Sequence, residues 1–359
     1  MKKIIISVLI YNLQFTIYNS NLFAQDDDPQ MVVVKDSASS AMGEAQTAYN
    51  NGISNLQNKK YNDAIADFTK AIQLLPDFDK AYYNRGIAKA EMKDYRGAIE
   101  DYNKLIAMKP SDNVYFSRGE AELALKNKQG AMNDFSKAIE LNPRVAKYFY
   151  NRGVLKFDKN DYQGAKDDFT KAINLDNKYA YAYNDRGSAN RQLEHYDEAI
   201  ADYNAAIKAN PSMAFAYNNL GSVKKKKGDF SGAVSEYSQA IRLKADYYIA
   251  YNNRGSAKFE LHDYEGAIKD FSEAIKLNTK YAFAYNNRAS AKFKMKDYKG
   301  SIADCDFAIT LDPQYGFAYL NRGIAKEMLR DNAGACKDWE KAGTLGVVNG
   351  TNYTKECSK

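Results

Sequence analysis

The chain is short of the residues that build most catalytic and metal sites. It has two histidines, three cysteines and one tryptophan in 359 residues. No Cys/His spacing of the zinc type occurs, and there is no glycine-rich phosphate loop. His195 and His262 fall in predicted turns between helices, where surface positions are expected. These absences predict no metal site, no cofactor and no enzymatic activity.

An excess of charge of one sign is also missing. There are 51 Lys and Arg against 45 Asp and Glu, a net charge of +6. Loss of Lys2 and Lys3 with a cleaved leader would leave 49 against 45, or +4. That excess is small for a chain of this length, so we expect no nucleic-acid partner.

Long apolar runs are absent, apart from an interrupted one at the start. Lys2 and Lys3 precede the apolar stretch Ile4–Ile10, which typifies an export signal. We predict a signal peptide over residues 1–24 and a polar linker over residues 25–44. The leader resembles those of exported proteins of Gram-negative bacteria of the Bacteroidetes type, which implies a periplasmic or secreted protein. An uncleaved anchor is the alternative, but the stretch is too short and interrupted for a stable membrane span.

What the chain has in abundance is a pattern that returns every 34 residues. Small residues mark the same position, called position 8, in nine consecutive units, with one interval of 33. They are Gly52, Gly86, Gly119, Gly153, Gly187, Gly221, Gly255, Ala289 and Gly323. With this numbering the units begin at Ala45, Asp79, Asp112, Ala146, Ala180, Ala214, Tyr248, Ala282 and Gly316.

Other positions then fall into register. Position 20 is Ala in all units but one, and position 24 is aromatic in all but one, where it is Cys305. Five of the six prolines occupy position 32. This pattern resembles the tetratricopeptide repeat (TPR) family, whose 34-residue unit is a helix–turn–helix. The resemblance implies an all-α fold, an α-solenoid of nine helix-turn-helix units over residues 45–345 that forms a right-handed superhelix.

The recurring residues have a packing explanation. Apolar residues at three- and four-residue steps favour two helices per unit, such as Ile249–Leu261 and Tyr264–Leu277. The small residue at position 8 lets the two helices approach closely, and the aromatic at position 24 fills the wedge toward the next unit. Proline at position 32 ends the second helix. Gly255 is therefore predicted to be structural.

Two positions depart from the family pattern and form a basic stripe. Position 7 is Arg in seven units and position 11 is Lys in six, whereas position 23 is acidic in all nine. One interpretation is a ladder of ion pairs in which each Arg meets the carboxylate of the preceding unit, as Arg254 would meet Glu236. The other is a track for polyanionic glycan, acidic lipid or nucleic acid.

Asparagine recurs on the first helices, which line the concave face in this family. Position 6 is Asn in most units, and position 5 is Asn in units 5 to 8. An amide both donates and accepts, so such a ladder suits an extended peptide main chain, as in the similar ladder of O-linked N-acetylglucosamine transferase. The candidate groove residues are Asn184, Asn218, Asn219, Asn252, Asn253, Asn286 and Asn287, with Phe215 and Phe283 beside them. The alternative is that these amides bond neighbouring helices within the scaffold.

The cysteines predict a closed C-terminal end. Cys305 replaces a core aromatic and is expected to be a buried thiol. Cys336 lies in unit 9 and Cys357 lies in the tail, so an oxidising compartment would allow them to bridge. The bridge would hold residues 346–359 as a capping tail over the last unit.

These features together predict a non-catalytic interaction scaffold. We expect it to bind an extended peptide or protein segment along the concave groove, with a cell-envelope binder of polyanionic glycan as the alternative. The chaperone-tail carboxylate clamp of the family needs Lys at position 5 and Arg at position 6. No unit has Arg at position 6, so chaperone C-termini are not expected partners.

Overall fold

The computed structural model describes residues 40–357, and all regular secondary structure in that range is helical. The predicted signal peptide and most of the predicted linker lie outside the described residues. The helix α1 starts at Ser40, so the linker predicted for residues 25–44 overlaps this helix by its last five residues. None of the helices described is long and apolar enough to cross a membrane.

The helices follow one another along the chain as pairs joined by short turns. They are α1 (Ser40–Gln57), α2 (Tyr61–Leu74), α3 (Asp79–Glu91), α4 (Tyr95–Met108), α5 (Asp112–Ala124), α6 (Lys128–Leu141), α7 (Ala146–Asp158), α8 (Tyr162–Leu175), α9 (Ala180–Gln192), α10 (Tyr196–Ala209), α11 (Ala214–Lys226), α12 (Phe230–Leu243), α13 (Tyr248–Glu260), α14 (Tyr264–Leu277), α15 (Ala282–Lys294), α16 (Tyr298–Leu311), α17 (Gly316–Met328), α18 (Asn332–Thr344) and α19 (Val348–Cys357).

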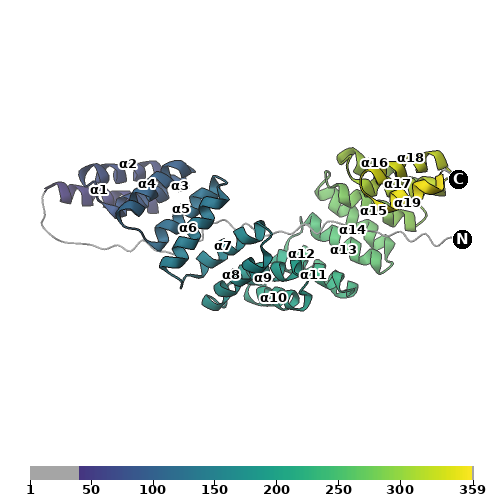
Figure 1. The fold of residues 1–359 in the computed structure, drawn as a ribbon, viewed down its shortest axis with the longest axis horizontal. Coiled ribbons are helices and arrows are strands. Elements are labelled where there is room, and N and C mark those ends of the chain that lie inside the picture. Colours follow the sequence, from purple (N-terminus) through teal and green to yellow (C-terminus); the bar gives the residue numbers. More distant parts are fainter. Residues whose placement is uncertain (1–39, 358–359) are drawn as a thin grey trace. The chain divides into compact units, whose positions relative to one another are not determined.

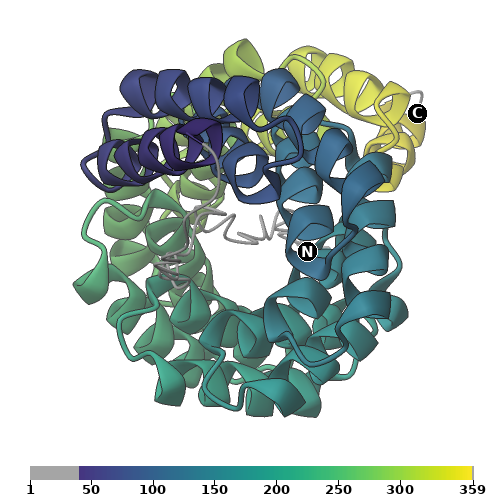
Figure 2. The same cartoon turned by 90° about the vertical axis from the view of Figure 1, so that its left-hand side faces the viewer.

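Each unit of the sequence pattern is one pair of these helices, which confirms the helix-turn-helix α-solenoid. Units 2 to 9 begin at the first residue of α3, α5, α7, α9, α11, α13, α15 and α17. Figures 1 and 2 show the two helices of a pair lying alongside one another. The described chain falls into two compact parts, residues 40–189 and 190–357, here called the N-terminal and C-terminal parts.

A local signal starts most of the second helices. Asp263 is the N-cap of α14, and its Oδ1 accepts a hydrogen bond from the backbone N of Gly266 at 2.9 Å. A Cβ on Gly266 would lie 2.1 Å from the Asp263 carboxylate, so a larger residue there would force the capping side chain to move. The same Asp/Gly or Asn/Gly cap occurs in α4, α6, α8, α12, α16 and α18. His262, just before the cap, has a positive φ of 62° and lies in the turn, as predicted.

In the core of most units, a glycine at position 8 packs against the aromatic ring at position 24. A Cβ on Gly255 would lie 2.8 Å from the Phe271 ring and 3.2 Å from the carbonyl oxygen of Ala267, so position 8 must be small. Unit 8 has the one exception at both positions, with Ala289 at position 8 and Cys305 at position 24. The larger residue at position 8 thus accompanies a smaller one at position 24. Burial also raises the pKa of the Cys305 thiol well above its usual range.

The C-terminal end is closed by α19, which packs against α18 of the last unit. Cys336 and Cys357 form a disulfide with their Cα atoms 5.9 Å apart, so this prediction is confirmed. Tyr353 of α19 stacks on Trp339, with ring centroids 4.9 Å apart. The buried Val347 joins the same apolar cluster. This helix therefore covers a face that the last unit would otherwise expose to water.

Candidate functional site

The predicted groove amides of the C-terminal part bond one another. Asn253 Nδ2 donates to Asn218 Oδ1 at 3.0 Å, and Asn287 Nδ2 donates to Asn252 Oδ1 at 2.9 Å. Asn321 Nδ2 continues the series to Asn286 Oδ1 at 2.9 Å. Each bond joins position 6 of one unit to position 5 of the unit before it. We call this set of bonds the amide seam.

The seam is buried. Asn218, Asn219, Asn252, Asn253, Asn286 and Asn287 are each at most 3 % exposed. A buried polar group needs a hydrogen-bond partner, and these amides supply partners to each other. The structure thus has the intramolecular arrangement that was the alternative to a peptide groove. In the N-terminal part, Asn184 is also buried and donates to Asp185 Oδ1 at 2.9 Å.

The N-terminal part makes the equivalent bond with tyrosine. Tyr49 Oη accepts from Asn84 Nδ2 at 3.0 Å, and Tyr150 Oη donates to Asp185 Oδ2 at 2.9 Å. Tyr83 Oη lies 3.3 Å from Ser117 Oγ in the same way. Positions 5 and 6 therefore join adjacent units in both parts, through a hydroxyl in one and an amide in the other.

Two buried polar atoms in or beside the seam have no hydrogen-bond partner within residues 40–357, and these are Asn252 Nδ2 and Tyr281 Oη. One unit further along, Asn286 Nδ2 donates to Tyr315 Oη at 3.2 Å. Asn252 and Tyr281 occupy the same repeat positions as Asn286 and Tyr315. The two atoms are thus counterparts of a bonded pair, and they do not indicate a ligand.

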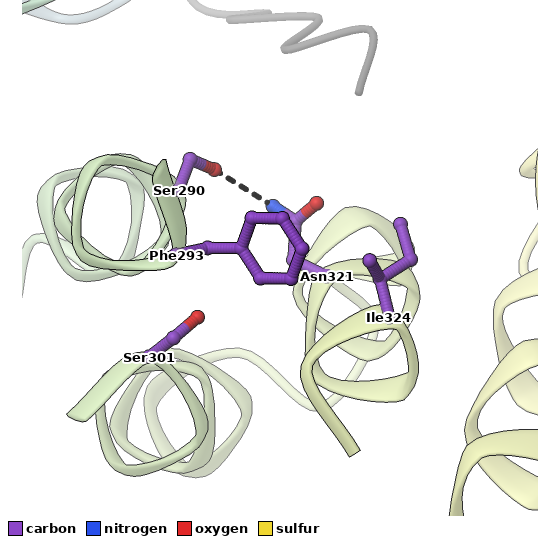
Figure 3. A pocket seen from close by; sticks show the side chains of 5 residues that line it. All are labelled: Ser290, Phe293, Ser301, Asn321 and Ile324. Carbon is purple, nitrogen blue, oxygen red and sulfur yellow. Dashed lines mark hydrogen bonds between the residues drawn. The ribbon is translucent and has the colours of Figure 1, made fainter. Parts of the chain in front are cut away.

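Serine at position 9 completes the seam in the C-terminal part. Figure 3 shows Ser290 of α15 and Asn321 of α17 joined by a hydrogen bond of 3.1 Å. Phe293 points between the helices beside them, with Ser301 and Ile324 lining the same narrow gap. Ser290 Oγ also donates to the carbonyl oxygen of Asn286 at 3.1 Å. The gap is a packing feature of the joint between units 8 and 9.

The basic stripe is held in ion pairs, but the predicted partner was wrong. Arg254 bonds Asp270 of its own unit through both Nε and Nη2, at 2.9 and 2.6 Å, and not Glu236 of the preceding unit. Five further arginines make the same bidentate contact 16 residues ahead: Arg85, Arg118, Arg152, Arg288 and Arg322. Helix periodicity could not decide between the two units, since both carry a carboxylate at position 23.

The preceding unit contributes a neutral group. Arg254 Nη1 donates to Ser238 Oγ of unit 6 at 3.1 Å, so one guanidinium spans the joint. Lys258 Nζ adds a second ion pair to Asp270 at 2.8 Å. Glu236 instead accepts from Lys224 Nζ at 2.6 Å within its own unit. Arg254 and Lys258 thus share the carboxylate of Asp270 within the scaffold, which favours the ion-pair interpretation of the stripe over a polyanion track.

What remains half-exposed on the first helices is a set of bulky side chains. Phe215, Phe283 and Phe317 at position 2 are half-buried, and so are Arg191 and Lys225 at position 12. Positions 2 and 12 are about 80° apart around the helix axis, so they lie on the same half of the helix surface. Arg191 and Lys225 were not among the residues predicted from the sequence. The available signal was position 12 itself, which is apolar in six of the other seven units.

These two cations are desolvated. Burial lowers the pKa of Arg191 to about 10 and that of Lys225 to about 8. Lys225 Nζ donates to Ser256 Oγ at 2.8 Å, and the charge of Glu260 opposes the shift. The first helices of units 5 and 6 therefore each carry a desolvated cation at position 12.

The N-terminal part has the opposite chemistry. Burial raises the pKa of Asp185 to about 7, opposed by the hydrogen bonds from Tyr150 and Asn184. It raises the pKa of the half-buried Glu120 to about 8, opposed by the charge of Lys147. No group of three or more His, Cys, Asp or Glu in residues 40–357 has a metal-binding arrangement.

Comparisons with known proteins agree with this architecture. Family models described as tetratricopeptide repeat or TPR repeat match residues 56–93, 83–146, 146–179, 187–228, 222–261, 248–281 and 284–315. A search of curated protein sequences returns no significant match.

Several solved structures are similar. A tetratricopeptide repeat protein from Parabacteroides merdae is 18 % identical over 69 % of this chain and 99 % of that one, with a TM-score of 0.56. The structure of the APC/C hetero-tetramer Cut9–Hcn1 is 14 % identical over 88 % of this chain and 76 % of that one, with a TM-score of 0.57. The crystal structure of MamA is 28 % identical over 45 % of this chain and 94 % of that one, with a TM-score of 0.42. The first two likenesses concern the fold. The family models, which together match more than half of the chain, establish that it belongs to the tetratricopeptide repeat family.

Proposed function

We propose that this protein is an exported, non-catalytic scaffold that binds an extended peptide or protein segment on the face of its first helices. The observation that carries the proposal is the half-exposed set at positions 2 and 12 in the C-terminal part. Phe215 and Phe283 offer apolar surface, and Lys225 offers a desolvated charge. Aromatic residues and cations are the side chains that contribute most to protein interfaces.

The seam amides have a supporting role in this proposal. Asn253 and Asn287 are buried and bonded to neighbouring amides, so a ligand would have to break those bonds to use them. We therefore assign contact with the ligand to the side chains above the seam. The amides fix the spacing between units and so the spacing of the binding side chains.

The share of the chain taken up by structural repeats supports a non-catalytic role. Residues 45–345 consist of repeating helix pairs, whose recurring polar residues serve caps, ion pairs and the seam. The Cys336–Cys357 disulfide suits an oxidising compartment and supports export to the periplasm or beyond.

The test is site-specific photocrosslinking in an envelope extract of the source cell. A photoreactive phenylalanine analogue replaces Phe215 or Phe283 in one set of variants. The matched control places it at Phe307, an aromatic on the second helix α16 that is 58 % exposed. We expect discrete protein adducts from the first two positions, which persist at 0.3 M salt, a concentration chosen to screen surface charge. Adducts from Phe307 alone, or none at all, would contradict the proposal.

A further inference from the structure

Unit 1 has an open cleft between α1 and α2. Its volume is about 490 Å³, and Ala48, Asn51, Asp67, Glu44 and Lys70 contribute to its walls. Ala48, Asn51 and Asp67 occupy positions 4, 7 and 23 of the repeat. In the other units these positions carry the side chains that fill the corresponding space.

Unit 2 shows how that space is filled. Arg85 bonds Asp101 through Nε and Nη2, at 3.0 and 2.6 Å. The same guanidinium lies 5.4 Å from the centroid of the Tyr82 ring. Five more units repeat this aromatic–arginine–aspartate set: units 3, 4, 7, 8 and 9. In unit 1 the aromatic is Ala48 and the arginine is Asn51, but the carboxylate of Asp67 is kept.

The carboxylate of Asp67 is thus left without the cations that the repeat normally provides. The side-chain bond that it receives within residues 40–357 comes from Asn55 Nδ2, at 2.8 Å. Asn55 stands where unit 2 has Lys89, which makes a second ion pair with Asp101 at 2.8 Å. Both basic partners of the repeat are therefore replaced by neutral amides in this one unit.

The charge around the cleft permits a cation. Glu44 adds a second carboxylate to its wall. Lys70 is exposed and carries the opposing charge, but Lys104 stands at the same position beside the filled site of unit 2. A lysine at this position is therefore compatible with a guanidinium on the carboxylate.

We propose that the cleft of unit 1 binds a cationic side chain, a guanidinium above all, seated on Asp67 in the geometry that the arginines of the later units show. Bidentate hydrogen bonds to a carboxylate favour arginine over lysine. The ligand is an arginine of a bound protein. A positive charge is also available from Lys35 of the chain itself, and from Lys2 and Lys3 while the leader is attached, and the test separates these sources from a bound protein. This site is distinct from the first-helix face of the proposed function.

The probe is N-acetyl-L-arginine amide, titrated into the full-length chain and followed by the NMR signals of the Asn51 and Asn55 side-chain amides. N-acetyl-L-citrulline amide, which is nearly isosteric and uncharged, is the control ligand. We expect saturable shifts with arginine and none with citrulline. Asp67→Asn should weaken arginine binding by about tenfold or more, because it removes the charge from the bonded oxygens.

A second variant fills the cleft from within. Ala48→Tyr with Asn51→Arg rebuilds the arrangement of unit 2, so it should abolish arginine binding without lowering the melting temperature. If the wild-type chain does not bind but a variant with Lys2, Lys3 and Lys35 changed to Ala does, the occupant is the chain's own lysine and the site is confirmed. The proposal is overturned if neither chain binds, or if Asp67→Asn binds as tightly as the wild type.

Discussion

The N-terminal and C-terminal parts join their units with the same hydrogen bond made from different side chains. In the N-terminal part Tyr150 reaches Asp185 of the next unit, and its ring also packs on Phe169, with centroids 5.8 Å apart. In the C-terminal part Asn218 accepts from Asn253. The asparagine side chain is shorter than tyrosine, so it makes the hydrogen bond but has no ring to pack on the aromatic residue at position 24. A buried tyrosine accompanies the amide of a later joint, where Tyr315 Oη accepts a hydrogen bond from Asn286 Nδ2 at 3.2 Å.

The difference shows what a repeated polar residue means in a solenoid. Positions 5 and 6 need a donor and an acceptor across the joint, and either chemistry satisfies that need. A run of asparagine is then one solution to a packing problem. The consequence for function is that recognition is assigned to the half-exposed side chains of the same helices.

We expect the largest loss of stability from a variant that breaks one hydrogen-bonded amide pair of the seam. Asn253→Leu keeps the approximate volume but leaves Asn218 Oδ1 buried without its donor, at a cost of about 1–3 kcal/mol. Changing Asn218→Leu in the same chain removes the stranded acceptor, so the double variant should lose less than the sum of the two single variants. Urea unfolding measures all three. A cost below about 0.5 kcal/mol for Asn253→Leu would mean that the amide pair does not join the units.

The tyrosine version of the joint should be less sensitive. Tyr150→Phe removes the donor to Asp185, but this carboxyl, with its pKa near 7, can bind a proton instead of remaining buried and charged. We expect a loss of about 1–2 kcal/mol at pH 8 and a smaller loss at pH 5. Equal losses at both values would show that Asp185 does not titrate in this range.

The two parts should also respond oppositely to pH. Asp185 and Glu120 have pKa values raised to about 7 and 8, from about 4 in the unfolded chain. The contribution of these two carboxyl groups to the free energy of unfolding is full below pH 4 and is lost as the pH rises to 8. Lys225, with its pKa lowered to about 8 from about 10.4, destabilises the fold below pH 8, and this penalty is relieved as pH rises toward 10.4.

Hydrogen exchange of peptides from α7 and α11, corrected for intrinsic rates, measures this contrast. Protection of α7 should fall between pH 5 and 8, and protection of α11 should rise between pH 8 and 10. Asp185→Asn should flatten part of the first profile, and Lys225→Met should flatten the second. Parallel profiles in the two helices would contradict the assignment of these groups.

The smallest effect that we expect is a gain in stability, from a substitution in unit 3. Phe116 occupies position 5 of unit 3 and has no hydroxyl, and Asn151 of the next unit donates instead to the carbonyl oxygen of Lys147 at 2.9 Å. Phe116→Tyr supplies the missing partner, as Tyr49 does for Asn84. We expect a stabilisation of up to about 1 kcal/mol in urea unfolding. A clear destabilisation would mean that the joint of unit 3 has no room for the hydroxyl.

The sequence was sufficient to predict the helix pairs, because position 8 glycine and position 24 aromatic residues meet within one unit, as Gly255 and Phe271 do. It also predicted the Cys336–Cys357 disulfide. It could not say which carboxylate Arg254 takes, since both units carry a carboxylate at position 23. Nor could it decide the direction in which Asn253 points, because an amide fits both a groove and a joint.

The most direct test of the account is the exchange of side-chain amide protons in asparagine-labelled protein. Asn253, Asn287 and Asn321 donate to neighbouring amides, whereas Asn62 is exposed and serves as the reference. We predict that the three Nδ2 groups exchange with water at least about tenfold more slowly than Asn62, because their protons are buried and bonded. Exchange as fast as that of Asn62 would show that these amides face solvent, and would return them to the ligand-binding surface.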